Sequence, residues 1–76
     1  MSSIQVEAAR IPDRDRLLAL LREHGLRAEP ESDVGIVVDG GDEEVFDAVE
    51  ELIMQIGAPF VPIRHEGVIY IRPPVG

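Results

Sequence analysis

The sequence predicts an α+β fold built from segments in the order β-α-β-β-α-β. Three observations support this prediction. Short stretches alternate between apolar and polar residues, which is the pattern of half-buried strands. Two longer stretches repeat apolar residues at helical spacing, and each is followed by glycine. The 76 residues contain no linker or low-complexity run, so we expect residues 1–76 to form a single domain.

The first strand is predicted in residues 3–9 and the first helix in residues 12–24. The apolar residues of the alternating strand are Ile4, Val6 and Ala8. Pro12 suits the first turn of a helix, where a missing backbone N–H leaves no hydrogen bond unmade. The apolar stripe of the helix contains Leu17, Leu18, Leu20 and Leu21. Gly25 is placed to form the left-handed cap that ends the helix.

Two strands are expected to follow, one starting at residue 26 and one over residues 34–39, joined by a turn at residues 31–33. Pro30 cannot donate a hydrogen bond to a neighbouring strand. The first of these strands is therefore predicted to be short or to lie at the edge of the sheet.

The second helix is predicted in residues 42–56, with Asp42 as its N-cap and Gly57 as its stop. Its apolar stripe consists of Val45, Val49, Leu52, Ile53 and Ile56. Two short apolar runs, residues 60–63 and 68–71, then flank the polar residues 64–67 and predict a hairpin whose turn contains Gly67.

This order of segments resembles the ferredoxin-like plait, also called the split β-α-β fold. The resemblance implies an antiparallel sheet with both helices on one face. Such folds carry many unrelated functions, so the predicted fold does not by itself indicate a function.

Composition disfavours several classes of function. The net charge of −8 opposes binding to nucleic acid or to anionic membranes. The absence of cysteine excludes disulfides and thiolate-bound metals. The sequence begins without the pattern of a secretory signal, and its longest apolar run is far shorter than a membrane span. We therefore expect a cytoplasmic protein without a cofactor.

The second helix is expected to expose an acidic face. Its carboxylates are Glu43, Asp47, Glu50 and Glu51. The favoured interpretation is a solvated face, or pairing with Arg14, Arg16 or Arg22 of the first helix. A docking surface for a basic partner is the alternative. A Mg²⁺ or Ca²⁺ site is the weakest hypothesis, because the sequence contains no loop with converging oxygen ligands.

The predicted hairpin contains the one local concentration of basic side chains. Arg64, His65, Tyr70 and Arg72 could line a small patch that binds an anionic ligand. The favoured interpretation is nevertheless an ordinary hairpin. Catalysis by His65 with Tyr70 or Arg64 is less favoured, because Glu66 is poorly placed to orient the imidazole ring.

The second face of the predicted sheet indicates an interface. Residues 34–38 and 68–71 are nearly continuously apolar, as in strands that are covered on both faces. Val37 and Ile69 are predicted to be partner-docking residues on this face, together with the acidic helix residues. The leading hypothesis is a non-catalytic domain for protein interaction or regulation that forms a homodimer through its sheet or binds another protein. The main alternative is a regulatory domain that binds a small molecule at a dimer interface.

Overall fold

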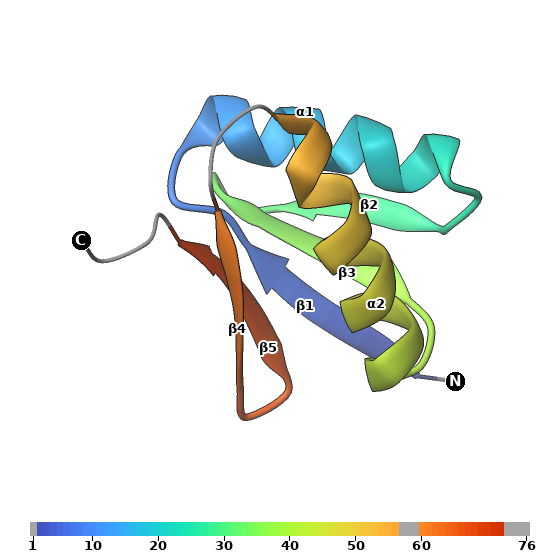
Figure 1. Cartoon of the computed structure of the whole chain (residues 1–76). Helices are drawn as coiled ribbons and strands as arrows, with labels where there is room; N and C mark the ends of the chain where they lie inside the picture. The colour runs from blue at the N-terminus through green and yellow to red at the C-terminus, as the bar shows by residue number, and fades with distance from the viewer. Residues whose placement is uncertain (1, 57–59, 73–76) are drawn as a thin grey trace.

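The computed structural model describes residues 2–56 and 60–72 and contains two helices packed on a five-stranded sheet (Figure 1). The elements are β1 (Ser3–Glu7), α1 (Ile11–Glu23), β2 (Ala28–Glu31), β3 (Gly35–Asp39), α2 (Asp42–Leu52), a short 3₁₀ helix (Ile53–Ile56), β4 (Val61–His65) and β5 (Val68–Arg72). The predicted α+β class is confirmed. Within the described ranges, neither α-helix is long and apolar enough to cross a membrane.

The sheet is mixed, whereas the sequence analysis predicts an antiparallel one. Its strand order is β2-β3-β1-β5-β4, and β1 pairs antiparallel with β3 but parallel with β5. The chain after α2 enters the sheet at its edge as β4. The hairpin then returns β5 to the position beside β1, so that β5 runs in the same direction as β1. The prediction of an antiparallel sheet is therefore wrong, and the strand order of the ferredoxin-like plait is not confirmed.

Helix α1 begins and ends at the predicted signals. Pro12 lies in its first turn, and Gly25 adopts a φ of 97° directly after the C-cap. The N–H of Gly25 donates to the carbonyl of Arg22, and the N–H of Leu26 donates to the carbonyl of Leu21. These two bonds form the expected left-handed cap and satisfy carbonyls at the end of the helix.

Helix α2 differs from the prediction at both ends. Its N-cap is Gly41, and Asp42 is the first helical residue. The α-helix ends at Leu52, and the chain continues as the 3₁₀ helix instead of extending the α-helix to residue 56. Gly57, the predicted stop, lies outside the described residues.

The core lies between the two helices and one face of the sheet. Its fully or nearly fully buried members include Ile4 and Val6 from β1, Ile36 and Val38 from β3, Ile69 and Ile71 from β5, and Leu17, Leu21, Val45, Val49 and Leu52 from the helices. Because successive strand residues point to opposite faces, the core residues of a strand also identify which of its residues lie on the other face.

Candidate functional site

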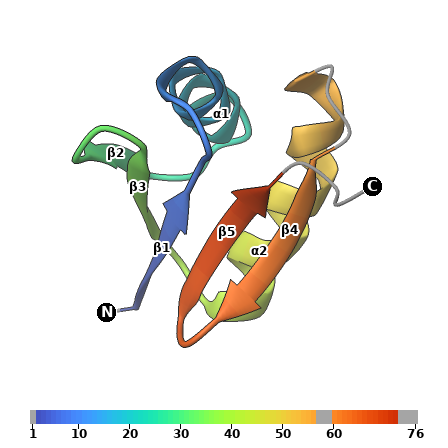
Figure 2. The same ribbon diagram turned by 90° about the vertical axis from the view of Figure 1, so that its left-hand side faces the viewer.

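The face of the sheet away from the helices, here called the open face, has two chemically different halves. Figure 2 shows the strands side by side in the sheet. Strands β1, β2 and β3 contribute an acidic half. It contains Glu7, Glu29, Glu31 and Asp39. Strands β4 and β5 contribute the second half, here called the hairpin patch. It consists of Val61, Ile63, His65, Val68, Tyr70 and Arg72.

The hairpin patch is organised as cross-strand pairs. Its register places Ile63 opposite Tyr70, with the pairs Val61–Arg72 and His65–Val68 on either side. Such pairs are the units through which side chains stabilise a sheet surface. Val61 and Ile63 are nevertheless 43% and 47% exposed. The patch therefore presents large apolar side chains to solvent, with a basic group at each end.

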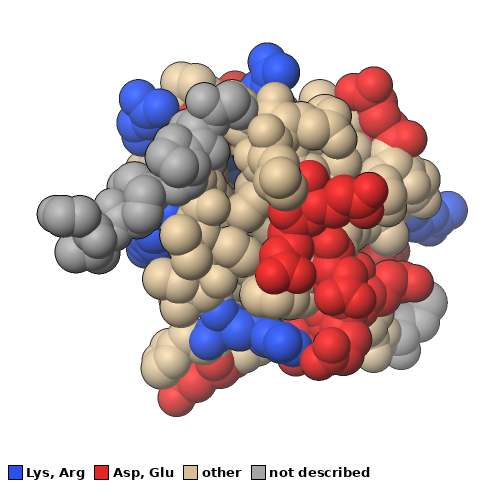
Figure 3. Space-filling view, viewed as in Figure 1, with Lys and Arg blue, Asp and Glu red and all other residues tan. Residues whose placement is uncertain are grey.

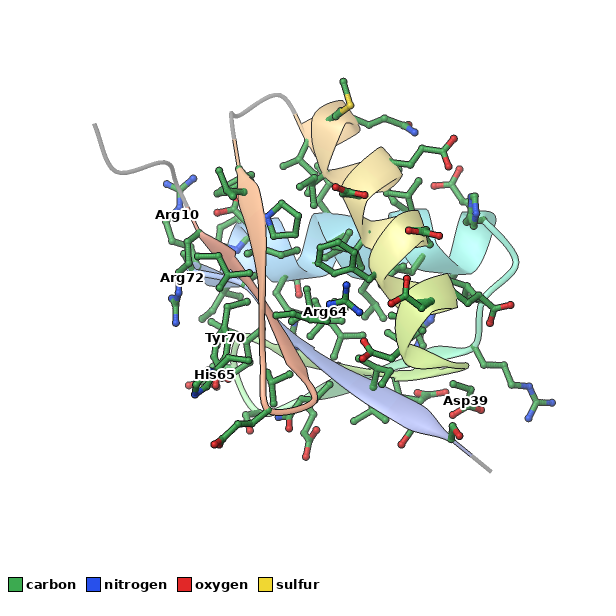
Figure 4. All side chains as sticks on the ribbon, turned by 60° about the horizontal axis from the view of Figure 1, so that its bottom comes forward. Arg10, Asp39, Arg64, His65, Tyr70 and Arg72 are labelled. Atoms are coloured by element: carbon green, nitrogen blue, oxygen red, sulfur yellow. The ribbon has the colours of Figure 1, made fainter. Side chains whose placement is uncertain are left out.

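Three of the four predicted ligand-binding residues meet in this patch. His65, Tyr70 and Arg72 line a shallow hollow of about 310 Å³ together with Ile63 (Figure 4). The guanidinium of Arg72 lies over the Tyr70 ring, 5.3 Å from the ring centroid. The hollow thus combines an apolar floor with an aromatic ring and a cation.

Arg64, the fourth predicted residue, lies on the opposite face of the sheet. It pairs with Ile69, so it points toward α2 and away from Tyr70 (Figure 4). Its Nη1 atom lies 3.0 Å from Glu43 and 3.4 Å from Asp42, and its guanidinium stacks 4.3 Å from the Phe46 ring centroid. The hydrogen bond to Glu43 raises the pKa of Arg64 above its ordinary value. Arg64 therefore joins the hairpin to α2 and does not belong to the candidate site.

The error for Arg64 arises from the length of the turn. The predicted turn spans residues 64–67, but β4 continues to His65 and only Glu66 and Gly67 form the turn. These two residues have φ values of 50° and 78°, as expected for a two-residue turn that joins hairpin strands. Because of the same error, Val61 and Ile63 were not predicted as site residues. The sequence signal that identifies them is the interval of two residues that places Val61, Ile63 and His65 on one face of the strand.

The hollow has the chemistry of a contact surface more than that of a catalytic centre. His65 is exposed, and its Nε2 atom lies 4.0 Å from the carboxylate of Glu66, beyond hydrogen-bond distance. A general base needs a positioned ring and a substrate held within hydrogen-bond reach. The open hollow supplies neither among the described residues.

The acidic face of α2 forms a second surface feature (Figure 3). Glu43 is paired with Arg64, while Asp47, Glu50 and Glu51 are exposed. Asp47 and Glu51 border a groove of about 380 Å³ between α2 and the end of α1; its other lining residues are His24, Leu26, Glu44 and Ala48.

Of the two favoured interpretations, pairing of these carboxylates with arginines of α1 is wrong, whereas the exposure of Asp47, Glu50 and Glu51 agrees with a solvated face. Arg14 donates to the carbonyls of Ser32 and Gly35, and Arg16 donates to the carbonyl of Gln55. Arg22 donates to the carbonyl of Ala28 and to Glu29. The basic residue that pairs with the acidic helix comes instead from β4.

The two apolar docking residues predicted for the second face are separated by the sheet. Val37 lies half-buried on the open face, beside Gln5. Ile69 is 0% exposed and packs in the core beneath the helices. Ile69 is therefore not available to a partner, because the alternation of β5 places its neighbours Val68 and Tyr70 on the open face instead.

The chain matches no protein-family model, no curated protein sequence and no solved structure.

Proposed function

We propose that this protein is a non-catalytic domain for protein interaction or regulation that self-associates through the open face of its sheet, with the hairpin patch at the centre of the contact. The observation that carries the proposal is the exposure of Val61 and Ile63 beside Tyr70 on a sheet face that the helices leave uncovered. The cytoplasmic location expected from the sequence stays a prediction.

The composition of the hairpin patch supports this proposal. Interface centres are enriched in tyrosine and arginine and depleted in lysine and acidic residues. The patch contains Tyr70 and Arg72. Its acidic neighbours are Glu66 in the turn and residues of the other strands, such as Glu7 beside Tyr70. A contiguous apolar patch with a polar border is the usual mark of an interaction site. A chain of 76 residues also gains from a partner, because a small domain buries a smaller share of its apolar surface.

We propose that the architecture is a ferredoxin-like plait modified by the hairpin. The order β2-β3-β1 and the crossover through α1 follow the ferredoxin-like plan, and β5 takes the place beside β1. Strand β5 carries Tyr70 and Arg72, so the hairpin that modifies the plait also forms the hairpin patch.

A regulatory domain that binds a small molecule is the second candidate. The hollow favours a ligand with a carboxylate and an apolar part, because Arg72 and His65 flank Ile63 and Tyr70. Thermal-shift assays against a panel of such carboxylates would test it. A ligand at about 100 times its dissociation constant adds about 2.7 kcal/mol of stability. The absence of any shift would count against this candidate.

The main experiment is light scattering coupled to size-exclusion chromatography over a range of protein concentrations. We expect the wild type to pass from monomer to dimer and Ile63→Glu to remain monomeric. The matched control is Met54→Glu, which introduces the same charge at a residue that is 80% exposed in the 3₁₀ helix. A wild type that stays monomeric at every concentration, or equal dimerisation of the two variants, would refute the proposal.

A further inference from the structure

We infer that two copies of this chain associate face to face, hairpin patch on hairpin patch, about a two-fold axis that runs parallel to the strands between β4 and β5. This inference rests on the proposed self-association and specifies its geometry. Two features of the sheet carry it: the position of a proline in each edge strand and the uneven distribution of charge across the open face.

Each edge of the sheet offers a further strand an incomplete row of N–H donors. The edge strands β2 and β4 contain Pro30 and Pro62, respectively. Proline has no N–H and is tolerated in a sheet where that N–H would point away from the neighbouring strand. Each edge therefore lacks a donor that an added strand would need.

The register of the hairpin determines which backbone groups of β4 point away from β5. A two-residue turn makes the flanking pair His65–Val68 a hydrogen-bonded pair, and such pairs alternate along antiparallel strands. The backbone groups of residues 62 and 64 consequently point outward. Since residue 62 is proline, Arg64 supplies the one outward N–H of β4. Association by strand addition at this edge is disfavoured, which leaves the open face.

The charge distribution on the open face disfavours one of the two directions that an axis in the plane of the contact can take. An axis in the plane of the contact that runs across the strands would stack β2 on β2 of the other copy. Glu31 would then approach the β2 carboxylates of that copy, of which Glu29 is paired with Arg22 of its own chain. Like charges brought together in an interface are strongly unfavourable. An axis parallel to the strands reverses the strand order of the second copy. When that axis lies between β4 and β5, the two patches overlap and the acidic strands lie outside the contact.

This arrangement predicts defined neighbours. Each β4 packs over β5 of the other copy, so Ile63 faces Tyr70 of the other copy and His65 faces Val68 of the other copy. Arg72 faces Val61 of the other copy, so the apolar side chains of the two patches meet. The aligned orientation also agrees with the common packing of two sheets, in which the strand directions differ by about 30°.

Cross-linking tests the geometry directly, because the chain contains no cysteine. The variants His65→Cys and Val68→Cys are mixed and treated with a short bis-maleimide reagent. We expect rapid formation of the mixed cross-linked dimer. The control mixture is Glu29→Cys with Glu31→Cys, which should cross-link at least tenfold more slowly. Faster reaction of the control mixture would overturn the inferred axis.

A third variant separates face contact from edge contact. Pro62→Val restores the missing N–H of β4, and we expect the dimer dissociation constant to stay within twofold of the wild type. Because a restored N–H can itself open the edge, the deciding comparison is with Ile63→Glu: an edge contact in the wild type would leave that variant dimeric and overturn the inference, whereas a face contact makes it monomeric. A monomeric wild type in light scattering would refute the proposed function itself. A wild-type dimer with the wrong cross-links would refute the geometry alone.

Discussion

Ile69 and Tyr70 are consecutive in β5, and the structure predicts opposite consequences for their truncation. Ile69 is 0% exposed and lies opposite Val6 of β1 in the core. Replacing a buried isoleucine by alanine costs roughly 2–5 kcal/mol, because apolar contacts are lost and a cavity remains. At about 0.05–0.15 kcal/mol per residue, a domain of this length has a total stability of about 4–11 kcal/mol. Ile69→Ala therefore removes a large part of it.

Urea unfolding followed by circular dichroism, at a protein concentration where the monomer dominates, measures this loss. With a slope of about 1 kcal/mol per molar urea, the lower value of the loss moves the midpoint down by about 2 M. Ile69→Val is the matched control and should cost roughly 0.5–1.5 kcal/mol.

Tyr70→Ala should give the reverse pattern. Tyr70 is half-buried on the open face, so we expect the unfolding of the monomer to change by about 1 kcal/mol or less while dimerisation weakens. If Ile69→Ala left the midpoint unchanged, or if Tyr70→Ala destabilised the monomer more than Ile69→Ala, the assignment of the two faces of β5 would be refuted.

Two further predictions concern the hairpin and the strand β3. Arg64→Gln should lower the melting temperature measured by circular dichroism. The decrease should be larger at low salt than at high salt, because salt screens the exposed ion pairs of Arg64. An equal decrease at the two salt concentrations would count against a stabilising role of these ion pairs. Because the pKa of Arg64 is raised in the folded state, its contribution to stability is complete below the unfolded-state pKa and is lost only at strongly alkaline pH. The difference in melting temperature between Arg64→Gln and the wild type should therefore stay constant across neutral pH. Gly67→Ala should cost about 1–2 kcal/mol from its φ of 78° alone, because no atom lies within 4 Å of the new Cβ. Gly35→Ala should cost more in the same urea assay, since its Cβ would lie 2.6 Å from the carbonyl oxygen of Glu31; the opposite order would contradict the close approach of β2 and β3.

The parts of the fold that depend on local signals could be predicted from the sequence. Pro12 and Gly25 bound α1 because a helix end is decided by a few neighbouring residues. The stripe of α2 that contains Val45 and Val49 could be identified from its spacing alone. The end of α2 could not, because the change to a 3₁₀ helix after Leu52 breaks no apolar pattern.

The arrangement of the hairpin depended on information that the sequence does not display locally. A turn of two residues instead of four keeps Arg64 in the strand and opposite Ile69. Strand faces alternate with a period of two, so a small error in a turn changes which residues can meet. The pairing of β5 with β1 is decided by packing across the sheet. The composition of the candidate site was therefore predictable for His65, Tyr70 and Arg72, but not its apolar floor or the true partner of Arg64.

The parallel pairing of β1 with β5 also has a consequence for the folding kinetics. This contact joins Gln5 to Val68, near opposite ends of the described chain, and closing so long a loop is entropically costly. The hairpin β4–β5 is local and can form on the microsecond timescale. Its docking onto β1 requires nearly the whole chain to be in place, so the slow step of folding should be the insertion of a preformed hairpin. Until the hairpin docks, β1 is an edge strand without a partner on one side. In the finished sheet, by contrast, each edge strand contains a proline.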